Sequence, residues 1–165
     1  MRLRELQQKD AQYMLEWMGD DEINRFFRFD AKSQTLESVE AFIKRAGEDR
    51  TAVHFACVND EDEYLGTVSL KKIDCENMNC EYAVSFRRCA HGSGAAEFAT
   101  RAVLELALSQ WGMEKVYLNV LASNERAIRF YEKLGAQYEG TAKRQIKING
   151  QFSDLKWYCW LKGQI

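Results

Sequence analysis

The chain has 165 residues, of which 46% are hydrophobic, 12% aromatic and 29% charged, and its formal net charge is -2. This length predicts one domain spanning residues 1–165, and the composition indicates a packed globular core rather than a disordered chain. The small net charge gives no general reason to expect nucleic acid as a partner.

The cysteine and histidine content argues against disulfides and metals. The five cysteines form no CxxC pair, and two histidines are too few for a His-based metal cluster. The first residues lack the apolar run of a signal peptide, and no segment approaches the roughly 18 apolar residues of a membrane helix. We therefore expect a cytoplasmic protein with no metal and no membrane partner.

The hydrophobic pattern predicts an alternation of strands and helices. A strand at 2–6 precedes a helix that Asp10 caps and Gly19 ends, and Thr35 opens a second helix. Strands are expected at 53–58, 64–73, 78–86 and 115–121, and helices at 94–111 and 124–134. Two strands at 138–148 and 151–161 form a hairpin, because Asn149-Gly150 favours a two-residue loop.

One loop has the composition of a phosphate-binding site. A predicted strand is joined to a long helix by Arg87-Arg88-Cys89-Ala90-His91-Gly92-Ser93-Gly94-Ala95-Ala96. Small residues let backbone N–H groups approach an anion, and the helix N-terminus adds partial positive charge. The alternative is an ordinary strand-to-helix turn that contains two glycines.

A second motif lies about thirty residues further on. It runs Asn124-Glu125-Arg126-Ala127-Ile128-Arg129-Phe130-Tyr131-Glu132-Lys133-Leu134-Gly135-Ala136. With the loop, it resembles the GNAT superfamily of acyl-CoA-dependent N-acetyltransferases, whose signatures are Arg/Gln-x-x-Gly-x-Gly/Ala before a helix and Asn-x-x-Ala followed by Tyr-x-Lys-x-Gly. The second signature fits this chain throughout, whereas the first fits in two registers, with either His91 or Cys89 at the Gln position.

The resemblance implies a fold and an activity. The fold is α/β (α+β), a twisted, mixed and mostly antiparallel sheet flanked by helices, and the expected cofactor is acetyl-CoA. A primary amine attacks the thioester directly. The chain also resembles the ribosomal-protein N-terminal acetyltransferases, so the acceptor is a protein N-terminus or a small-molecule amine such as an amino sugar. The alternatives are a non-catalytic acyl-CoA-binding module and, less favoured, a dinucleotide-binding protein; a homodimer is left open.

The resemblance also implies a set of binding residues. The loop and the strand before it hold the pyrophosphate and the pantetheine arm. The predicted cofactor-binding residues are Val84, Phe86, Arg87, Arg88, His91, Gly92, Ser93, Gly94, Ala95, Ala96 and Asn124. Asn124 could instead cap its helix. The predicted acceptor-binding residues are Phe26, Phe27 and Asn119, and core packing explains at least one of the two phenylalanines.

Two residues are predicted to catalyse acetyl transfer, which needs a base for the amine and a proton donor for the leaving thiolate. Glu81 interrupts an apolar strand and is the predicted base, unless it faces solvent. Tyr131 is the tyrosine of the second motif, which in the family lies beside the cofactor sulfur, and it is the predicted proton donor. Its alternative role is that of a core aromatic residue.

Overall fold

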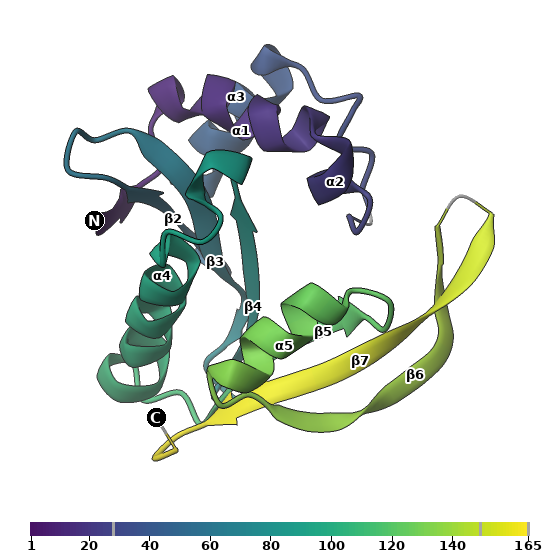
Figure 1. The fold of residues 1–165 in the computed structure, drawn as a ribbon. Helices are drawn as coiled ribbons and strands as arrows, with labels where there is room; N and C mark the ends of the chain where they lie inside the picture. Colours follow the sequence, from purple (N-terminus) through teal and green to yellow (C-terminus); the bar gives the residue numbers. More distant parts are fainter. Residues whose placement is uncertain (28, 149, 165) are drawn as a thin grey trace. The chain divides into compact units, whose positions relative to one another are not determined.

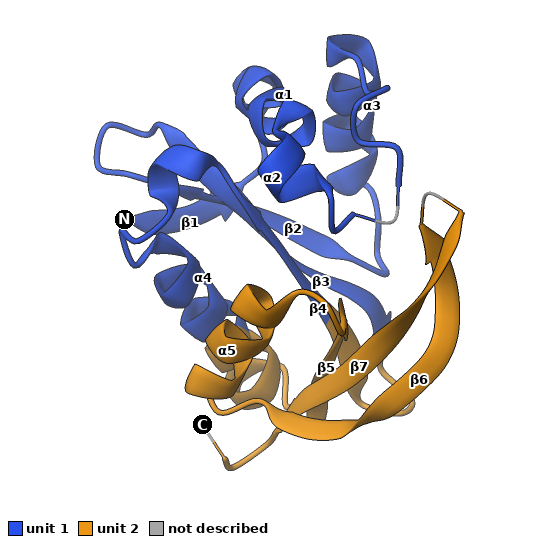
Figure 2. Ribbon diagram, turned by 45° about the vertical axis from the view of Figure 1, so that its right-hand side comes forward, with its two compact units in different colours: residues 1–73, 82–103 blue, residues 74–81, 104–165 orange. Residues whose placement is uncertain are grey.

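The computed structural model describes residues 1–27, 29–148 and 150–164, and it divides into two compact units. Unit 1 comprises Met1–Ile73 and Tyr82–Val103, and unit 2 comprises Asp74–Glu81 and Leu104–Ile165 (Figure 2). The chain therefore enters and leaves each unit more than once, within β3, β4 and the long helical stretch. A single domain over residues 1–165 stays a prediction.

The observed elements follow the expected order (Figure 1). They are β1 (Arg2–Glu5), η1 (Gln8–Asp10), α1 (Ala11–Gly19), α2 (Asp21–Asn24), α3 (Leu36–Ala46), β2 (Val53–Val58), β3 (Tyr64–Asp74), β4 (Asn79–Phe86), η2 (Arg88–Ala90), α4 (Ala95–Leu104), η3 (Glu105–Gln110), β5 (Lys115–Leu121), α5 (Glu125–Lys133), β6 (Gln137–Ile148) and β7 (Gln151–Leu161). The strand order is β1-β2-β3-β4-β5-β7-β6. The β4–β5 pair is parallel, whereas β1–β2, β2–β3, β5–β7 and β6–β7 are antiparallel, which confirms the expected fold class.

Unit 1 has its core between α1, α3 and the strands β2 and β3. Met14 and Trp17 of α1 and Val39 and Ile43 of α3 are buried, since residues three or four apart share one helix face. The Trp17 indole N–H donates to the Tyr64 hydroxyl at 3.0 Å, so a buried polar contact ties α1 to β3.

The two predicted helix caps differ in outcome. Thr35 caps α3 as expected: its hydroxyl accepts from the Ser38 amide at 3.2 Å, and the Ser38 hydroxyl accepts from the Thr35 amide at 2.9 Å. The prediction for Asp10 is wrong, because its side chain makes no capping bond to α1. Its carboxylate instead accepts from the Arg4 guanidinium at 2.7 and 2.8 Å and from the Gln7 amide at 2.8 Å.

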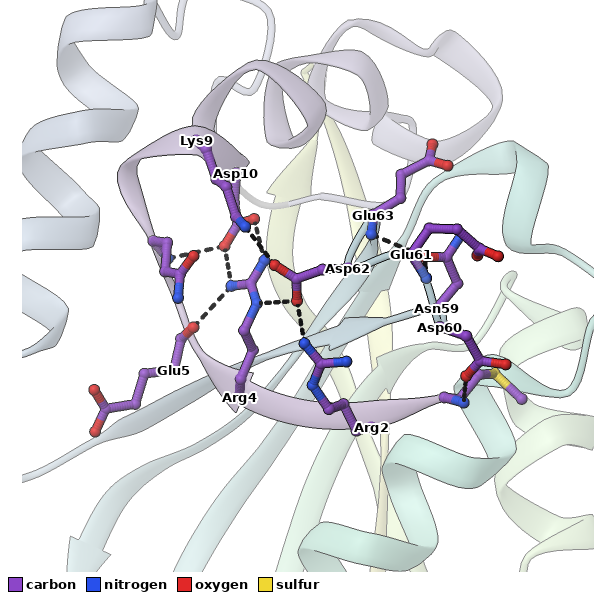
Figure 3. A network of polar contacts seen from close by, with 12 residues as sticks. Arg2, Arg4, Glu5, Lys9, Asp10, Asn59, Asp60, Glu61, Asp62 and Glu63 are labelled. Carbon is purple, nitrogen blue, oxygen red and sulfur yellow. Dashed lines mark hydrogen bonds and ion pairs between the residues drawn. The ribbon is translucent and has the colours of Figure 1, made fainter.

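Asp10 belongs to a network that ties the N-terminal strand to the β2–β3 turn (Figure 3). In that turn, Asp62 accepts from Arg2 at 2.7 Å and from Arg4 at 3.0 Å, and it also pairs with Lys9. The hydrogen bonds from Lys9 and Arg4 lower the pKa of Asp62 to about 2. Arg4 thus bridges two carboxylates that lie more than fifty residues apart in sequence.

Unit 2 joins α5 to the antiparallel strands β5, β7 and β6. The Trp160 indole N–H of β7 donates to the Leu134 carbonyl at the end of α5 (2.9 Å), which anchors the helix. Ile148 pairs with Gln151, as the expected hairpin requires, although Asn149 lies outside the described residues. The predicted helix at 94–111 is α4 followed by the π-helical turn η3. Gly112, at φ +72°, follows that turn, as expected for a helix-terminating glycine.

None of the helices within residues 1–27, 29–148 and 150–164 is long and apolar enough to cross a membrane.

We expect Arg4→Met to lower the free energy of unfolding by about 3–5 kcal/mol, because it leaves the Asp10 carboxylate, 1% exposed, without its cation. Lys9→Met is the control, since that ammonium is 53% exposed, and it should cost less than about 1 kcal/mol. Urea denaturation measures both values. Equal losses in the two variants would show that burial of the Arg4–Asp10 pair is unimportant.

Candidate functional site

The predicted phosphate loop precedes α4 and has an open surface. Gly92 and Gly94 have φ values of +80° and +83°, a left-handed conformation that favours glycine. A Cβ atom placed at either residue would meet nothing within 4 Å. The two glycines are therefore explained by backbone conformation, and they leave room in front of the loop.

The loop presents several N–H groups at one helix end. The Ser93 hydroxyl accepts from the Ala95 amide (3.2 Å) and donates to the Ala90 carbonyl (2.7 Å), which holds the turn in place. Among the described residues, the amides of Gly92, Gly94 and Ala96 have no hydrogen-bond acceptor. Together with the dipole of the ten-residue helix α4, this arrangement can bind an anion such as a phosphate.

The two arginines before the loop already hold carboxylates. Arg87 donates to Glu16 and Glu63 at 2.6 Å each, and its guanidinium lies 4.5 Å from the Tyr13 ring centroid. Arg87 therefore fixes the end of β4 to α1 and β3. Arg88 is exposed and pairs with Asp20 at 2.5 and 2.7 Å, and its hydrogen bond lowers the pKa of that carboxyl to about 2. A phosphate contact from either arginine stays a prediction.

The strand residues predicted to contact the cofactor lie in different environments. Phe86 is buried, and a Cβ atom on Gly66 would approach its ring carbon Cγ to 2.4 Å, so this ring packs directly on the β3 backbone. Val84 lines a cavity within unit 1. His91 is exposed and ends the short turn η2. Contacts of Val84, Phe86 and His91 with the cofactor stay predictions.

The unit 1 cavity is open on one side, has a volume of about 470 Å³ and is lined by residues of α1, α3, the segment between α2 and α3, and β2, β3 and β4. Its apolar walls include Trp17, Val39 and Phe42. Thr67, Ser69 and Lys71 also line it, because alternate residues of a strand share one face. The sequence analysis missed these three residues. The signal in the sequence is the alternation of these polar side chains along the predicted strand 64–73.

His54 also lines this cavity. Its Nδ1 atom lies 2.8 Å from the Ser69 hydroxyl, and its ring meets that of Phe42 edge to face at 5.1 Å. Burial lowers the pKa of the imidazole, the charge of Lys71 lowers it further, and Asp49 opposes the shift. The imidazole is therefore neutral at pH 7.

The aromatic segment after α2 lies partly at this cavity, and acceptor binding by Phe26 and Phe27 stays a prediction. Phe29 lines the cavity, whereas Phe26 and Phe27 are absent from its lining. Phe27 packs edge to face on Trp17 and stacks on Phe29, with centroid distances of 5.3 Å in both cases. Phe26 lies 4.7 Å from the guanidinium of Arg25. Arg28 lies outside the described residues.

Unit 2 holds both predicted catalytic residues. Glu81 is 4% exposed and is paired in register with Tyr117 of β5, so it does not face solvent. Asn119 lies two residues further along β5, and its side-chain oxygen is buried with no hydrogen-bond partner among the described residues. Tyr131 lies against Phe130 and Trp160, with centroid distances of 5.5 and 6.2 Å. Burial raises the pKa of its hydroxyl to about 12.

Asn124 acts as a helix cap, one of its two expected roles. Its side-chain oxygen accepts from the Ala127 amide at 3.2 Å, which satisfies a donor in the first turn of α5. This bond is local in sequence, and it explains the Asn-x-x-Ala spacing without a ligand. A contact between Asn124 and pantetheine stays a prediction.

Comparison with known proteins assigns the family. The model of the acetyltransferase (GNAT) domain matches residues 1–137. The spermidine N(1)-acetyltransferase of Escherichia coli K12 is 25% identical over 164 residues, which cover 99% of this chain and 87% of that protein. A crystal structure of spermidine N-acetyltransferase from Vibrio cholerae in complex with CoA and spermine superposes with a TM-score of 0.89 at 21% identity, covering 99% and 96% of the two chains.

A relative that matches over a shorter part of the chain carries the name of a different kind of acetyltransferase. A Bacillus subtilis protein, whose name assigns it provisionally to the ribosomal N-acetyltransferases, is 27% identical over 97 residues, 59% of this chain and 53% of its own. The family match covers most of the chain and agrees with the mixed sheet, the open loop before α4 and the intact second motif. The chain therefore belongs to the GNAT acetyltransferase family and is an acetyl-CoA-dependent N-acetyltransferase.

Proposed function

We propose that this enzyme acetylates the primary amine of a small molecule, and that the loop before α4 holds the pyrophosphate of acetyl-CoA. The observation that carries the loop assignment is the set of three amides, from Gly92, Gly94 and Ala96, which have no acceptor among the described residues. They lie beside open space at a helix N-terminus, where phosphate is stabilised. When bound, acetyl-CoA supplies the acetyl thioester.

The proposed role of Glu81 is to take a proton from the acceptor amine. The amine is nucleophilic only when neutral, and a lysine-like amine with a pKa near 10.4 needs more help from a base than an α-amino group near 7.7–8. As the carbon–nitrogen bond forms and the carbon–sulfur bond breaks, the proton leaves nitrogen for Glu81. Its burial within β4 keeps the carboxylate away from bulk water.

The proposed role of Tyr131 is to donate a hydrogen bond to the departing sulfur. With a pKa of about 12, its hydroxyl is fully protonated at pH 7. A thiol has a pKa near 8.5, so complete proton transfer from this phenol would be uphill by roughly 3.5 pKa units. Hydrogen bonding to the developing thiolate therefore contributes more than full transfer does.

Relatives suggest which acceptors to test. The spermidine N(1)-acetyltransferases of Escherichia coli and Vibrio cholerae match along 99% and 94% of this chain, which supports a small-molecule amine. The provisional ribosomal relative matches over 59% of the chain, so a protein N-terminus has weaker support. A homodimer stays a prediction that light scattering can test.

A thiol-release assay with acetyl-CoA tests the proposed function. The acceptors are polyamines, amino sugars, amino acids and N-terminal peptides, and we expect turnover with a small-molecule amine. Acetyl-CoA should also raise the melting temperature, because it binds the folded state, whereas NAD should not. Binding of acetyl-CoA without turnover of any amine would point instead to a non-catalytic acyl-CoA-binding module.

Gly94→Val should weaken acetyl-CoA binding by about tenfold or more, because valine strains the left-handed backbone and fills the space where a phosphate would approach. Calorimetry on the folded variant measures the effect. The matched control is Gly163→Val at φ +81°, outside the loop, which imposes similar backbone strain. Unchanged affinity in Gly94→Val would mean that the pyrophosphate lies elsewhere.

Glu81→Gln should reduce turnover most at low pH, where the acceptor amine is most protonated and a base contributes most. The amide is nearly isosteric, so acetyl-CoA affinity should hardly change. The measurement is kcat/KM between pH 6 and 9. A profile parallel to that of the parent enzyme would remove Glu81 from proton transfer.

Tyr131→Phe should retain the fold and acetyl-CoA binding but lose about 10²-fold in kcat, the scale for removing a hydrogen-bond donor to a charge that develops in the transition state. The ring contacts with Phe130 and Trp160 remain, so only the hydroxyl is tested. Circular dichroism and steady-state kinetics separate folding from chemistry. Full activity would identify Tyr131 as a core aromatic residue.

A further inference from the structure

We infer that the acceptor amine also carries an oxygen that accepts a hydrogen bond, in a hydroxyl or a carbonyl group, and that the Thr67 hydroxyl donates to this oxygen in the unit 1 cavity. The inference rests on the proposed function and narrows its acceptor from any small amine to one with such an oxygen beside an apolar body. It assigns acceptor specificity to a residue that lies outside both signature motifs.

The first argument is the direction of the buried hydrogen bonds that end at Thr67. The Trp17 indole N–H can only donate, and it donates to the Tyr64 hydroxyl at 3.0 Å. The Tyr64 hydroxyl lies 2.7 Å from the Thr67 hydroxyl, and Tyr64 has no exposed surface. If Thr67 donated to Tyr64, the hydrogen of the Tyr64 hydroxyl would be buried without an acceptor among the described residues, which is unfavourable. Tyr64 therefore donates to Thr67.

This direction leaves the hydrogen of the Thr67 hydroxyl for another partner. Within residues 1–27, 29–148 and 150–164, the Thr67 hydroxyl forms no hydrogen bond besides the one to Tyr64. Thr67 is only 7% exposed, and it lines the cavity. A nearly buried donor without an acceptor is costly, so a ligand that brings an acceptor into the cavity gains this hydrogen bond on binding.

The second argument concerns which atom of the acceptor meets this hydrogen. The lone pair of the reacting amine attacks the thioester, so it cannot accept a hydrogen bond in the same step. An ammonium group elsewhere in the ligand has three donors and no lone pair. Hydroxyl and carbonyl oxygens do have lone pairs and take no part in the transfer. Thr67 therefore recognises an oxygen of the acceptor that does not react.

The lining also disfavours a second ammonium group. No aspartate or glutamate is among the described residues that line the cavity, so an ammonium bound there would lose its water without gaining a carboxylate. Acidic side chains gather instead at a second hollow of unit 1, about 570 Å³ in volume, whose lining includes Asp10, Glu40, Glu61, Asp62 and Glu63. An amine whose other polar group is an oxygen thus suits the first cavity better than a polyamine does.

The third argument is the apolar part of the lining and its position. Met14, Trp17 and Val39 are only 2%, 5% and 1% exposed, and such surface suits the hydrocarbon part of a ligand. Val84 and Ser85 of β4 also line the cavity, and β4 leads into the loop that we propose for the pyrophosphate. The cavity therefore borders the strand that carries this loop, which supports an acceptor site rather than an unrelated pocket.

The experiment compares matched amines with and without the oxygen. Amino alcohols with short apolar chains are assayed beside the alkylamines in which a methyl group replaces the hydroxyl, and spermidine is included. Phenylethylamines that carry a hydroxymethyl, an acetyl or an ethyl group on the ring distinguish hydroxyl from carbonyl oxygens. We expect kcat/KM to be about tenfold or more higher for the best oxygen-bearing amine than for its hydrocarbon partner. Equal values in every pair, or a preference for spermidine over all of them, would overturn the inference.

Variants then test whether Thr67 makes the bond. Thr67→Val keeps the shape of the side chain without its hydroxyl, so the ratio of kcat/KM within a pair should fall about tenfold, whereas Thr67→Ser should retain it. Thr100→Val is the matched control, because Thr100 is also buried and lies 2.7 Å from a tyrosine hydroxyl, that of Tyr82, but does not line the cavity. Its ratio should equal that of the parent enzyme. An equal loss toward both members of each pair in Thr67→Val would contradict the assignment.

The comparison of acceptors on the parent enzyme does not depend on the folding of any variant. Failure of the proposed function gives a different result. If no amine is turned over, calorimetry still measures how tightly the same amines bind. Tighter binding of the oxygen-bearing amines that is lost in Thr67→Val and kept in Thr67→Ser would support the Thr67 contact, whereas equal binding within the pairs, or none, would overturn it.

Discussion

The buried hydrogen-bonded chain Trp17–Tyr64–Thr67 is the interaction on which the arrangement of unit 1 depends. Tyr64 has no exposed surface, and its hydroxyl lies 3.0 Å from the Trp17 indole nitrogen and 2.7 Å from the Thr67 hydroxyl. A phenol buried without partners would cost free energy, so these bonds fix α1 relative to β3 as well as satisfying the group. Trp17 and Thr67 also line the unit 1 cavity, so the same contact positions two of its walls.

Both arginines before the loop already bind carboxylates, so the anion-binding groups that we propose are the backbone amides after them. Arg87 is neutralised by Glu16 and Glu63 and fixes the end of β4, and Arg88 holds Asp20. We propose that the amides of Gly92, Gly94 and Ala96, which follow the arginines, contact the ligand. A site built from backbone dipoles is fixed in geometry before the ligand arrives, which lowers the cost of binding. The arginines contribute by holding the elements that carry the loop.

A small net charge does not require that positive and negative side chains be evenly distributed over the molecule. Side chains of both signs are nearly balanced over the chain, but no Asp or Glu is among the described residues that line the unit 1 cavity, whereas five line the hollow around Asp62. Membership of the GNAT family specifies a donor and a reaction class. The acceptor depends on such local lining, because binding energy comes from complementary groups within a few ångströms.

The sequence by itself determined the features that arise from neighbouring residues: the order of helices and strands, the Thr35 cap, the hairpin pairing of Ile148 with Gln151, and the glycine-containing loop before α4. Such features depend on local backbone preferences, which a sequence pattern records directly. Tertiary structure decided the rest. The Asp10 side chain does not cap α1, because its carboxylate binds the Arg4 guanidinium of β1. A hydrogen bond between two charged groups is stronger than one to a helix amide. Glu81 is buried, Phe29 rather than Phe26 or Phe27 lines the unit 1 cavity, and residues of α3 and β3 line that same cavity. These outcomes depend on which faces of distant elements pack together, and no short pattern in the chain specifies that.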